Sequence, residues 1–218
     1  ILNQIQLSIV LFVELFWKRR MKVKKITITK IAGIDYSLTS PCICVCDIQN
    51  EEFDFNNCEF HFFAQTKHQL QLPHKNLFSY SPIEYTTESE RYNELSEWVL
   101  DIFSINFIKT NVYFEDYAFA ATGRVFHIAE NVGVLKHKFW QQNIKYETFA
   151  PTTIKKTATG KGSSSKRDMY ESFVEQTEFD FRKDLAPNST EIGNPVSDIV
   201  DSYFICKHGY EQKEKIKS

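Results

Sequence analysis

Runs of apolar and β-branched residues, separated by polar turns, predict strands in the first third of the chain. Residues 25–35 alternate and then become continuously apolar, which is typical of a strand that enters a buried sheet. Residues 42–48 and 58–64 predict two further strands, joined by a polar hairpin over 50–57. Residues 65–85 contain two prolines and show no clear period, so they predict a loop. The pattern thus predicts a meander of three strands.

The rest of the chain alternates between helical and strand-like periods. Thr87 and Glu90 have the spacing of a capping box and precede a helix with one apolar face. The β-branched and aromatic run over 109–119 predicts a buried central strand. The later elements are a helix over 123–142, a strand over 145–149, a helix from Lys166, and a last helix capped by Asn194 with Pro195 in its first turn. This order predicts the α/β class, with a mixed five-stranded sheet of three antiparallel-connected strands plus parallel strands, flanked by helices.

Length and composition fit one folded domain with appendages. The 218 residues are 42% hydrophobic and 15% aromatic, which is enough for a sizeable core. The apolar run within residues 1–20 is too short, and too interrupted by Glu14, to span a bilayer, and basic residues follow it, unlike in a secretory signal. We expect an N-terminal extension over 1–20, a domain over 21–208, a charged and frayed tail over 209–218, and no membrane association. A membrane-surface anchor in the extension is the alternative.

The net charge of −2 hides two basic stretches. Residues 18–30 hold seven basic residues and residues 151–167 hold five, with no acidic residue in either. Local patches of this kind matter more for nucleic-acid binding than the overall balance. The second stretch is rich in Gly and Ser and predicts a phosphate-binding loop, although it lacks the spacing of a P-loop. Its basic side chains are Lys155, Lys156, Lys161, Lys166 and Arg167.

Five cysteines, an odd number, occupy positions 42, 44, 46, 58 and 206. Three of them alternate along one predicted strand, so they face one way, and the C-x-x-C spacing of common zinc sites is missing. The main interpretation is small buried side chains in a reducing cytoplasm, and a zinc site is the alternative.

Four carboxylates stand out by their positions. Asp35 ends the first strand, Glu115 ends the central strand, and Asp198 and Asp201 share one face of the last helix. Asp116 points to the other side of the sheet, as a structural acceptor. If the first and central strands are parallel neighbours, the four carboxylates meet at one sheet edge, where like charges need a cation. Oxygen ligands favour Mg²⁺ or Mn²⁺, and two such ions would stabilise the attacking water and the leaving oxygen of a phosphodiester.

Several motifs then occur in one order along the chain. They are residues 33–40 (GIDYSLTS), 114–119 (FEDYAF), 124–136 (RVFHIAENVGVLK), 151–155 (PTTIK), 159–162 (TGKG) with Lys166, and 198–201 (DIVD). Taken together they closely resemble the RuvC family of Holliday junction resolvases, from about residue 31 to residue 206. The combination is specific even though each motif alone is weak.

This resemblance implies a ribonuclease H-like fold, a homodimer, and Mg²⁺-dependent nicking of branched DNA, with Mn²⁺ able to substitute. It makes Asp35, Glu115, Asp198 and Asp201 the catalytic and metal-binding quartet. It places the two important lysines of the family at Lys155 and Lys166, close to the scissile phosphate, and the dimer contact on the helix over 123–142. The residues expected to bind DNA are Lys155, Lys156, Lys161, Lys166, Arg167, Tyr117 and Phe119.

The chain also departs from the family pattern. Bacterial members carry a base-stacking aromatic residue where this chain has the segment around Tyr117 and Phe119, and residues 65–85 form a long insertion. These departures suggest a divergent phage or mobile-element type, acting on nucleic acid in the cytoplasm of a bacterial or phage-infected cell.

The expected activity is metal-dependent, structure-specific hydrolysis that resolves four-way junctions or other branched DNA. A flap nuclease or an RNA–DNA hybrid nuclease with the same fold is the first alternative. A catalytically idle DNA-binding module is the second, and it is disfavoured because a carboxylate quartet without a cation is electrostatically expensive.

Overall fold

The computed structural model describes residues 29–48, 52–71, 76–116 and 125–217, and its centre is a six-stranded sheet. The strands are β1 (Thr29–Asp35), β2 (Cys42–Ile48), β3 (Cys58–Phe63), β4 (Leu77–Tyr80), β5 (Val112–Glu115) and β6 (Tyr146–Phe149). Their order across the sheet is β4-β3-β2-β1-β5-β6. The β1, β2 and β3 strands form the antiparallel meander, whereas β1, β5 and β6 run parallel. The predicted α/β class with a mixed sheet is confirmed.

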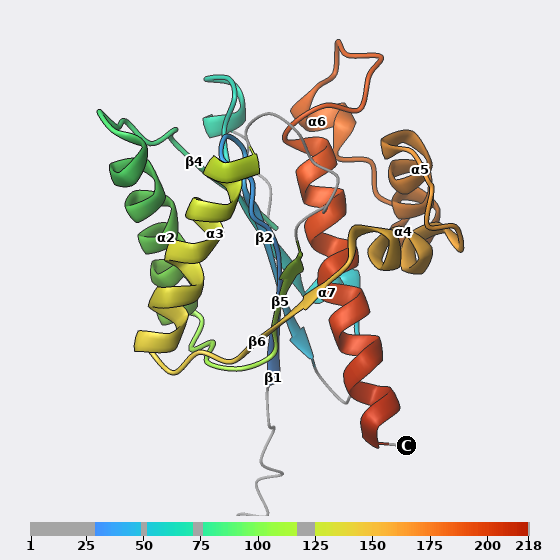
Figure 1. Cartoon of the computed structure of the whole chain (residues 1–218). Coiled ribbons are helices and arrows are strands. Elements are labelled where there is room, and N and C mark those ends of the chain that lie inside the picture. Colours follow the sequence, from blue (N-terminus) through green and yellow to red (C-terminus); the bar gives the residue numbers. More distant parts are fainter. Residues whose placement is uncertain (1–28, 49–51, 72–75, 117–124, 218) are drawn as a thin grey trace, which may run out of the picture.

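Helices cover both faces of this sheet (Figure 1). They are α2 (Glu88–Ile105), α3 (Val125–Gln141), α4 (Pro151–Thr159), α5 (Lys166–Thr177), α6 (Arg182–Leu185) and α7 (Val196–Lys217), with short 3-10 turns η1 (Phe55–Asn57) and η2 (Gln69–Gln71). The α2 and α3 helices, green and yellow in Figure 1, lie on one face, and α7, in red, lies on the other, with α4, α5 and α6 beyond it. Across the residues that the structure describes, no helix is long and apolar enough to cross a membrane.

Each face has its own hydrophobic core. On the α7 side, strand residues pack with Phe173, Phe181 and Phe204, and this core contains all five cysteines, each free and buried. The prediction that the cysteines are small buried side chains is therefore confirmed. On the other side, α2 and α3 pack Trp98, Phe103 and their neighbours against the sheet. Burial on both faces explains why the central strands read as continuous apolar runs.

Two glycines allow α7 to lie unusually close to the sheet. A Cβ atom on Gly33 of β1 would stand 2.3 Å from the backbone nitrogen of Cys206 and 2.4 Å from the backbone oxygen of Ser202. A Cβ atom on Gly209 of α7 would stand 2.2 Å from the ring of Tyr113 in β5. Real Cβ atoms do not tolerate such distances, so this helix can cross β1 and β5 only because both positions lack a side chain.

The predicted loop over 65–85 contains a strand. Leu77–Tyr80 forms β4, which pairs in parallel with β3 and makes the sheet six-stranded instead of five-stranded. The strand has only 4 residues and stands at the sheet edge, with Leu77 buried and Phe78 40% exposed. Such a short alternation is too weak to be recognised from sequence.

The predicted basic loop over 151–166 also proves to be half helical. Pro151 occupies the first turn of α4, Ile154 and Ala158 are buried one turn apart, and Gly160 ends the helix with a φ of 78°. Only residues 160–165 remain as a loop, and Ser165 caps α5 through a capping box with Asp168.

The last helix differs from its prediction at both ends. It begins at Val196, so Pro195 and not Asn194 directly precedes it, and the carbonyl of Pro195 accepts from Ile199 N at 3.0 Å. At the other end α7 continues to Lys217, so the tail from residue 209 is not frayed. Gly209 reads as a helix stop in the sequence, but here it is a packing residue against Tyr113.

Some predictions fall on residues that are not described. The N-terminal extension over 1–20 and residues 117–119 of the predicted central strand lie outside the described residues. Ahead of α2, Thr87 Oγ1 accepts from Glu90 N at 3.1 Å, as in a capping box, and the carboxylate of Glu90 accepts from Thr86 N at 2.8 Å.

Candidate active site

Asp35 and Glu115 end two neighbouring parallel strands in the same register. The pairs Ala32 with Val112, Gly33 with Tyr113, and Ile34 with Phe114 lead directly to these two carboxylates. Side chains alternate between the faces of a sheet, so Asp35 shares a face with Gly33, and Glu115 shares a face with Tyr113. Gly33 and Tyr113 both lie against α7. Both carboxylates therefore leave the sheet on its α7 side.

The first turns of α7 supply the other two carboxylates. Asp198 is only 5% exposed, and hydroxyl groups hold both of its oxygens. Ser40 Oγ donates to Oδ2 at 2.5 Å, and Ser197 Oγ shares its one proton between Asp198 Oδ1 at 3.3 Å and Asn194 Oδ1 at 3.0 Å. Asp201 follows three residues later, partly buried, on the same side of the helix. The close crossing of α7 at Gly33 thus brings residues from three distant parts of the chain to one edge of the sheet.

All four carboxylates have pKa values raised by burial, and the charges of neighbouring carboxylates add to the shifts of Asp35, Glu115 and Asp201. Burial raises the pKa of Asp35 well above its ordinary value, and the charges of Asp201, Asp198 and Glu115 raise it further. Burial and the charge of Asp201 raise the pKa of Glu115 to about 7. Burial also raises the pKa of Asp201, to about 6. The pKa of Asp198 is raised by burial but less so, because Ser40, Lys166 and Ser197 stabilise its ionised form. The positive charges of the protein therefore do not fully compensate the negative charge of these carboxylates at neutral pH.

The donor set suits a hard divalent cation, although it is not a finished coordination sphere. Carboxylate oxygens are the ligands that Mg²⁺ and Mn²⁺ prefer, and clustered carboxylates with raised pKa values are stabilised when a cation binds between them. Within the described ranges, however, no group of three or more His, Cys, Asp or Glu side chains is arranged so that it could hold a metal ion. Binding would therefore require these side chains to turn toward a common ion.

Two lysines reach the acidic cluster from α4 and α5. Lys166, the first residue of α5, donates from Nζ to Ser197 Oγ at 3.3 Å, and its charge opposes the raised pKa of Asp35, Asp198 and Asp201. Lys155 of α4 opposes the raised pKa of Glu115 and Asp201 in the same way. The structure thus brings all six predicted catalytic side chains into one electrostatic neighbourhood.

The other predicted DNA-binding residues are placed differently. Lys156 and Lys161 are exposed on and just after α4. Arg167 forms an ion pair with Glu171 of α5 at 3.8 Å and donates to the carbonyl of Thr190 at 3.3 Å. Its guanidinium therefore already has partners within the protein. Tyr117 and Phe119 lie outside the described residues.

Three residues that support this site were not predicted from the sequence: Gly33, which lets α7 approach the sheet, and Ser40 and Ser197, which donate to Asp198. Each stands close in the sequence to a predicted carboxylate, which is the one signal that would have pointed to them. The 158-residue separation of Ser40 from Asp198 hides their contact. The same holds for Gly33, whose small size is explained only by the backbone of α7.

Comparisons with known proteins place the fold. No protein-family model matches the sequence, and the search of curated proteins gives no match. Among solved structures, a Thermus thermophilus RuvC structure matches with a TM-score of 0.53 and 12% identity, covering 86% of this chain and 97% of that one. The structure of T. thermophilus RuvC in complex with a Holliday junction substrate matches with a TM-score of 0.55 and 13% identity, covering 85% and 96%. The chain therefore has the ribonuclease H-like fold of RuvC, as the sequence motifs implied.

Proposed function

We propose that this protein is a metal-dependent endonuclease that cleaves branched DNA, with four-way junctions as its main substrate. The observation that carries the proposal is the convergence of Asp35, Glu115, Asp198 and Asp201 at one sheet edge, beside Lys155 and Lys166. Support comes from the shared fold, since one of the matching RuvC structures is a complex with a Holliday junction substrate.

The four carboxylates would hold Mg²⁺, or Mn²⁺ in its place. When bound, the ions neutralise the acidic cluster, lower the pKa of water and stabilise charge on the phosphodiester. Lys166 and Lys155 lie where they would bind oxygens of the scissile phosphate and compensate the charge that builds up during attack. Attack of water on phosphorus breaks the bond to the 3′ oxygen and leaves a 5′ phosphate.

A homodimer fits this substrate and the surface of α3. Opposed strands of a four-way junction need two nicks, which two copies of one active site supply. The α3 helix exposes large apolar side chains, with Phe126 77% exposed and Trp140 74% exposed. Together with Gly133 they follow a seven-residue spacing along one side of the helix, which is the pattern of helix pairs that pack against each other. We take this stripe, Phe126, Gly133 and Trp140, as the dimer contact.

A panel of labelled substrates tests the activity. Purified protein is incubated with a four-way junction, a flap, an RNA–DNA hybrid and a linear duplex, in Mg²⁺ and in EDTA. We expect paired nicks in the junction in Mg²⁺ only, with 5′ phosphate ends. Preference for the flap or the hybrid would move the protein to another nuclease class with the same fold. An uncut panel at every protein concentration would reject the nuclease function.

Lys166→Ala separates catalysis from binding in the same assay. Loss of a cation at the scissile phosphate lowers cleavage by roughly 100-fold. Junction affinity changes by no more than about threefold, because one phosphate contact among many is lost. Lys145→Ala is the matched control, since it removes an exposed lysine ahead of β6, at the sheet edge opposite to the carboxylates, and should leave both quantities nearly unchanged. Equal losses of cleavage and binding in Lys166→Ala would contradict its proposed role.

A further inference from the structure

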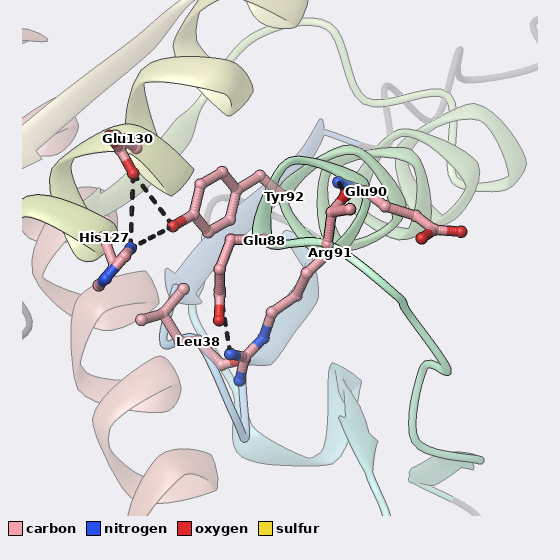
Figure 2. Close-up of polar contacts among 8 residues, drawn as sticks. Leu38, Glu88, Glu90, Arg91, Tyr92, His127 and Glu130 are labelled. Atoms are coloured by element: carbon pink, nitrogen blue, oxygen red, sulfur yellow. Dashed lines mark hydrogen bonds and ion pairs between the residues drawn. The ribbon is translucent and has the colours of Figure 1, made fainter.

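Arg91 of α2 is a charged residue buried against the turn that follows β1. Its side chain is 6% exposed. Nε and Nη2 both donate to the backbone oxygen of Leu38, at 3.1 and 2.7 Å, and Nη1 lies 3.4 Å from Glu88 Oε2. Figure 2 shows the guanidinium between Glu88 and Leu38. The ring of Tyr85 covers it at 4.7 Å. A buried guanidinium with this set of partners fixes the position of the carbonyl to which it donates.

The turn that Arg91 holds leads directly into the acidic cluster. Leu38 lies between Asp35, at the end of β1, and Ser40, which donates to Asp198. Within the turn, the backbone nitrogen of Ser40 donates to Ser37 Oγ at 3.0 Å. Ser40 is only 1% exposed, so its hydroxyl has little room for another orientation. The guanidinium of Arg91 is therefore connected to Asp198 through the turn over 36–41, which has its own internal hydrogen bond.

Asp198 differs from the other three carboxylates in this respect. Its two oxygens accept from Ser40 and Ser197, whereas in the described part of the chain Asp35, Glu115 and Asp201 accept no hydrogen bond. Partners outside the first coordination shell orient metal ligands and restrict their rotation. Asp198 is thus the one carboxylate whose orientation is set by the protein before a cation arrives.

We infer that Ser40 and Arg91 are positioning residues: Ser40 orients Asp198 toward the cation, and Arg91 holds the 36–41 turn so that Ser40 can do so. The inference rests on the proposed function, because it takes Asp198 as a cation ligand. A role limited to stability would leave cation affinity unchanged in variants that remain folded, and the two roles are separated on that basis.

The first experiment measures equilibrium Mn²⁺ binding by electron paramagnetic resonance, without DNA. Ser40→Ala and Arg91→Lys are expected to bind Mn²⁺ about tenfold more weakly than wild type. Lysine keeps the charge at position 91 but cannot place two N–H groups on one carbonyl. Ser202→Ala is the matched control for Ser40, because it removes an equally buried hydroxyl whose partners are Ile199 O and Cys42 Sγ. Wild-type affinity in folded Ser40→Ala would overturn the role of Ser40.

The second experiment needs no metal. Hydrogen exchange of the backbone amides of residues 36–40 is measured in EDTA for wild type, Arg91→Lys and Tyr92→Phe. Tyr92 is the neighbouring residue of α2, and its hydroxyl contacts His127 and Glu130 of α3 instead of the turn (Figure 2). Exchange over 36–40 should accelerate about tenfold in Arg91→Lys and stay unchanged in Tyr92→Phe. Unchanged exchange in Arg91→Lys would overturn the role of Arg91.

The two experiments also separate this inference from the proposed function. If the wild-type protein fails to bind Mn²⁺, the metal-dependent function is rejected, and the exchange measurement still decides whether Arg91 holds the turn. If the wild type binds Mn²⁺ and both variants bind it equally well, the function stands and the positioning role is rejected.

Discussion

The two faces of the central sheet are built by different rules. On one face α7 lies so close that Gly33 and Gly209 have no room for a Cβ atom, and all four site carboxylates gather at the edge of that contact. On the other face α2 and α3 pack through large side chains such as Phe103 and Phe139, whose rings stack 5.7 Å apart. The α7 face, called the close face below, positions the site carboxylates, and the α2 and α3 face forms a hydrophobic core of large side chains. Substitutions on the two faces should therefore have different kinds of effect.

The largest effect is expected from a carboxylate on the close face. Asp201→Asn should lower junction cleavage about 1000-fold, because a ligand for the ions is lost. In metal-free protein the same change should raise thermal stability at pH 8, since it relieves repulsion with Asp198 and Asp35. Cleavage rates and thermal unfolding in EDTA measure the two results. Asp101→Asn on exposed α2 is the control and should change neither. Lower stability in Asp201→Asn would indicate a structural role instead.

The next largest effect is expected from Gly33→Ala. In most strands alanine is preferred to glycine, so propensity alone predicts a small gain. Here the new Cβ would meet backbone atoms of α7 at 2.3 and 2.4 Å, and backbone cannot rotate away. We expect a loss of about 3 kcal/mol in the free energy of unfolding, measured by urea titration. A neutral result would show that α7 has freedom to shift, and would weaken the contrast between the faces.

The same contrast explains what the sequence could predict. The strands β1 and β5 and their terminal carboxylates were recognisable, because continuous apolar runs and their polar ends are local features. The helical half of the basic stretch was missed, since its Gly and Ser residues follow α4 while only Ile154 and Ala158 mark its buried side. The edge strand β4 was not predicted because 4 residues are too few to show a clear alternation of apolar and polar side chains.

The individual hydrogen bonds between distant segments could not be predicted from the sequence. Arg91 to Leu38 spans 53 positions and Ser40 to Asp198 spans 158, and neither residue type is unusual where it stands. The motif around Asp35 contained both Gly33 and Ser40, yet only the position of α7 shows why one is small and the other carries a hydroxyl. The carboxylates could be identified from the sequence, whereas the residues that hold them in place could be identified only from the structure.

A smaller effect is expected from pH in the absence of metal. Glu115 has a pKa of about 7 in the folded protein, against an ordinary value of 4.5 in an unfolded chain. Between these values the folded state carries more protons, so the free energy of unfolding should fall as pH rises from 4.5 through about 7. The loss from this group is roughly 2 kcal/mol, after allowance for its partial exposure to solvent.

Urea titrations in EDTA from pH 5 to pH 8 measure this dependence. Glu115→Gln should flatten the decline, because glutamine does not titrate. Adding Mg²⁺ at pH 8 should restore stability to the wild type more than to the variant, since the cation stabilises the ionised carboxylate. Identical slopes in the wild type and the variant would show that Glu115 titrates normally and does not belong to the acidic cluster.

The smallest effect is expected on the opposite face, at Gly133 of α3. A Cβ atom at this exposed position would meet nothing within 4 Å. Helix propensity then acts alone, and Gly133→Ala should raise the free energy of unfolding by about 1 kcal/mol, measured at protein concentrations low enough to keep the chain monomeric. Gly133 also lies in the proposed dimer stripe with Phe126 and Trp140, where a second copy would come close. If the variant is stabilised as a monomer but its dimer dissociates more readily in sedimentation, the space at Gly133 is filled by the partner helix. Loss of stability already in the monomer would contradict the open surroundings of this glycine, and the two faces would then differ less than the close approach at Gly33 implies.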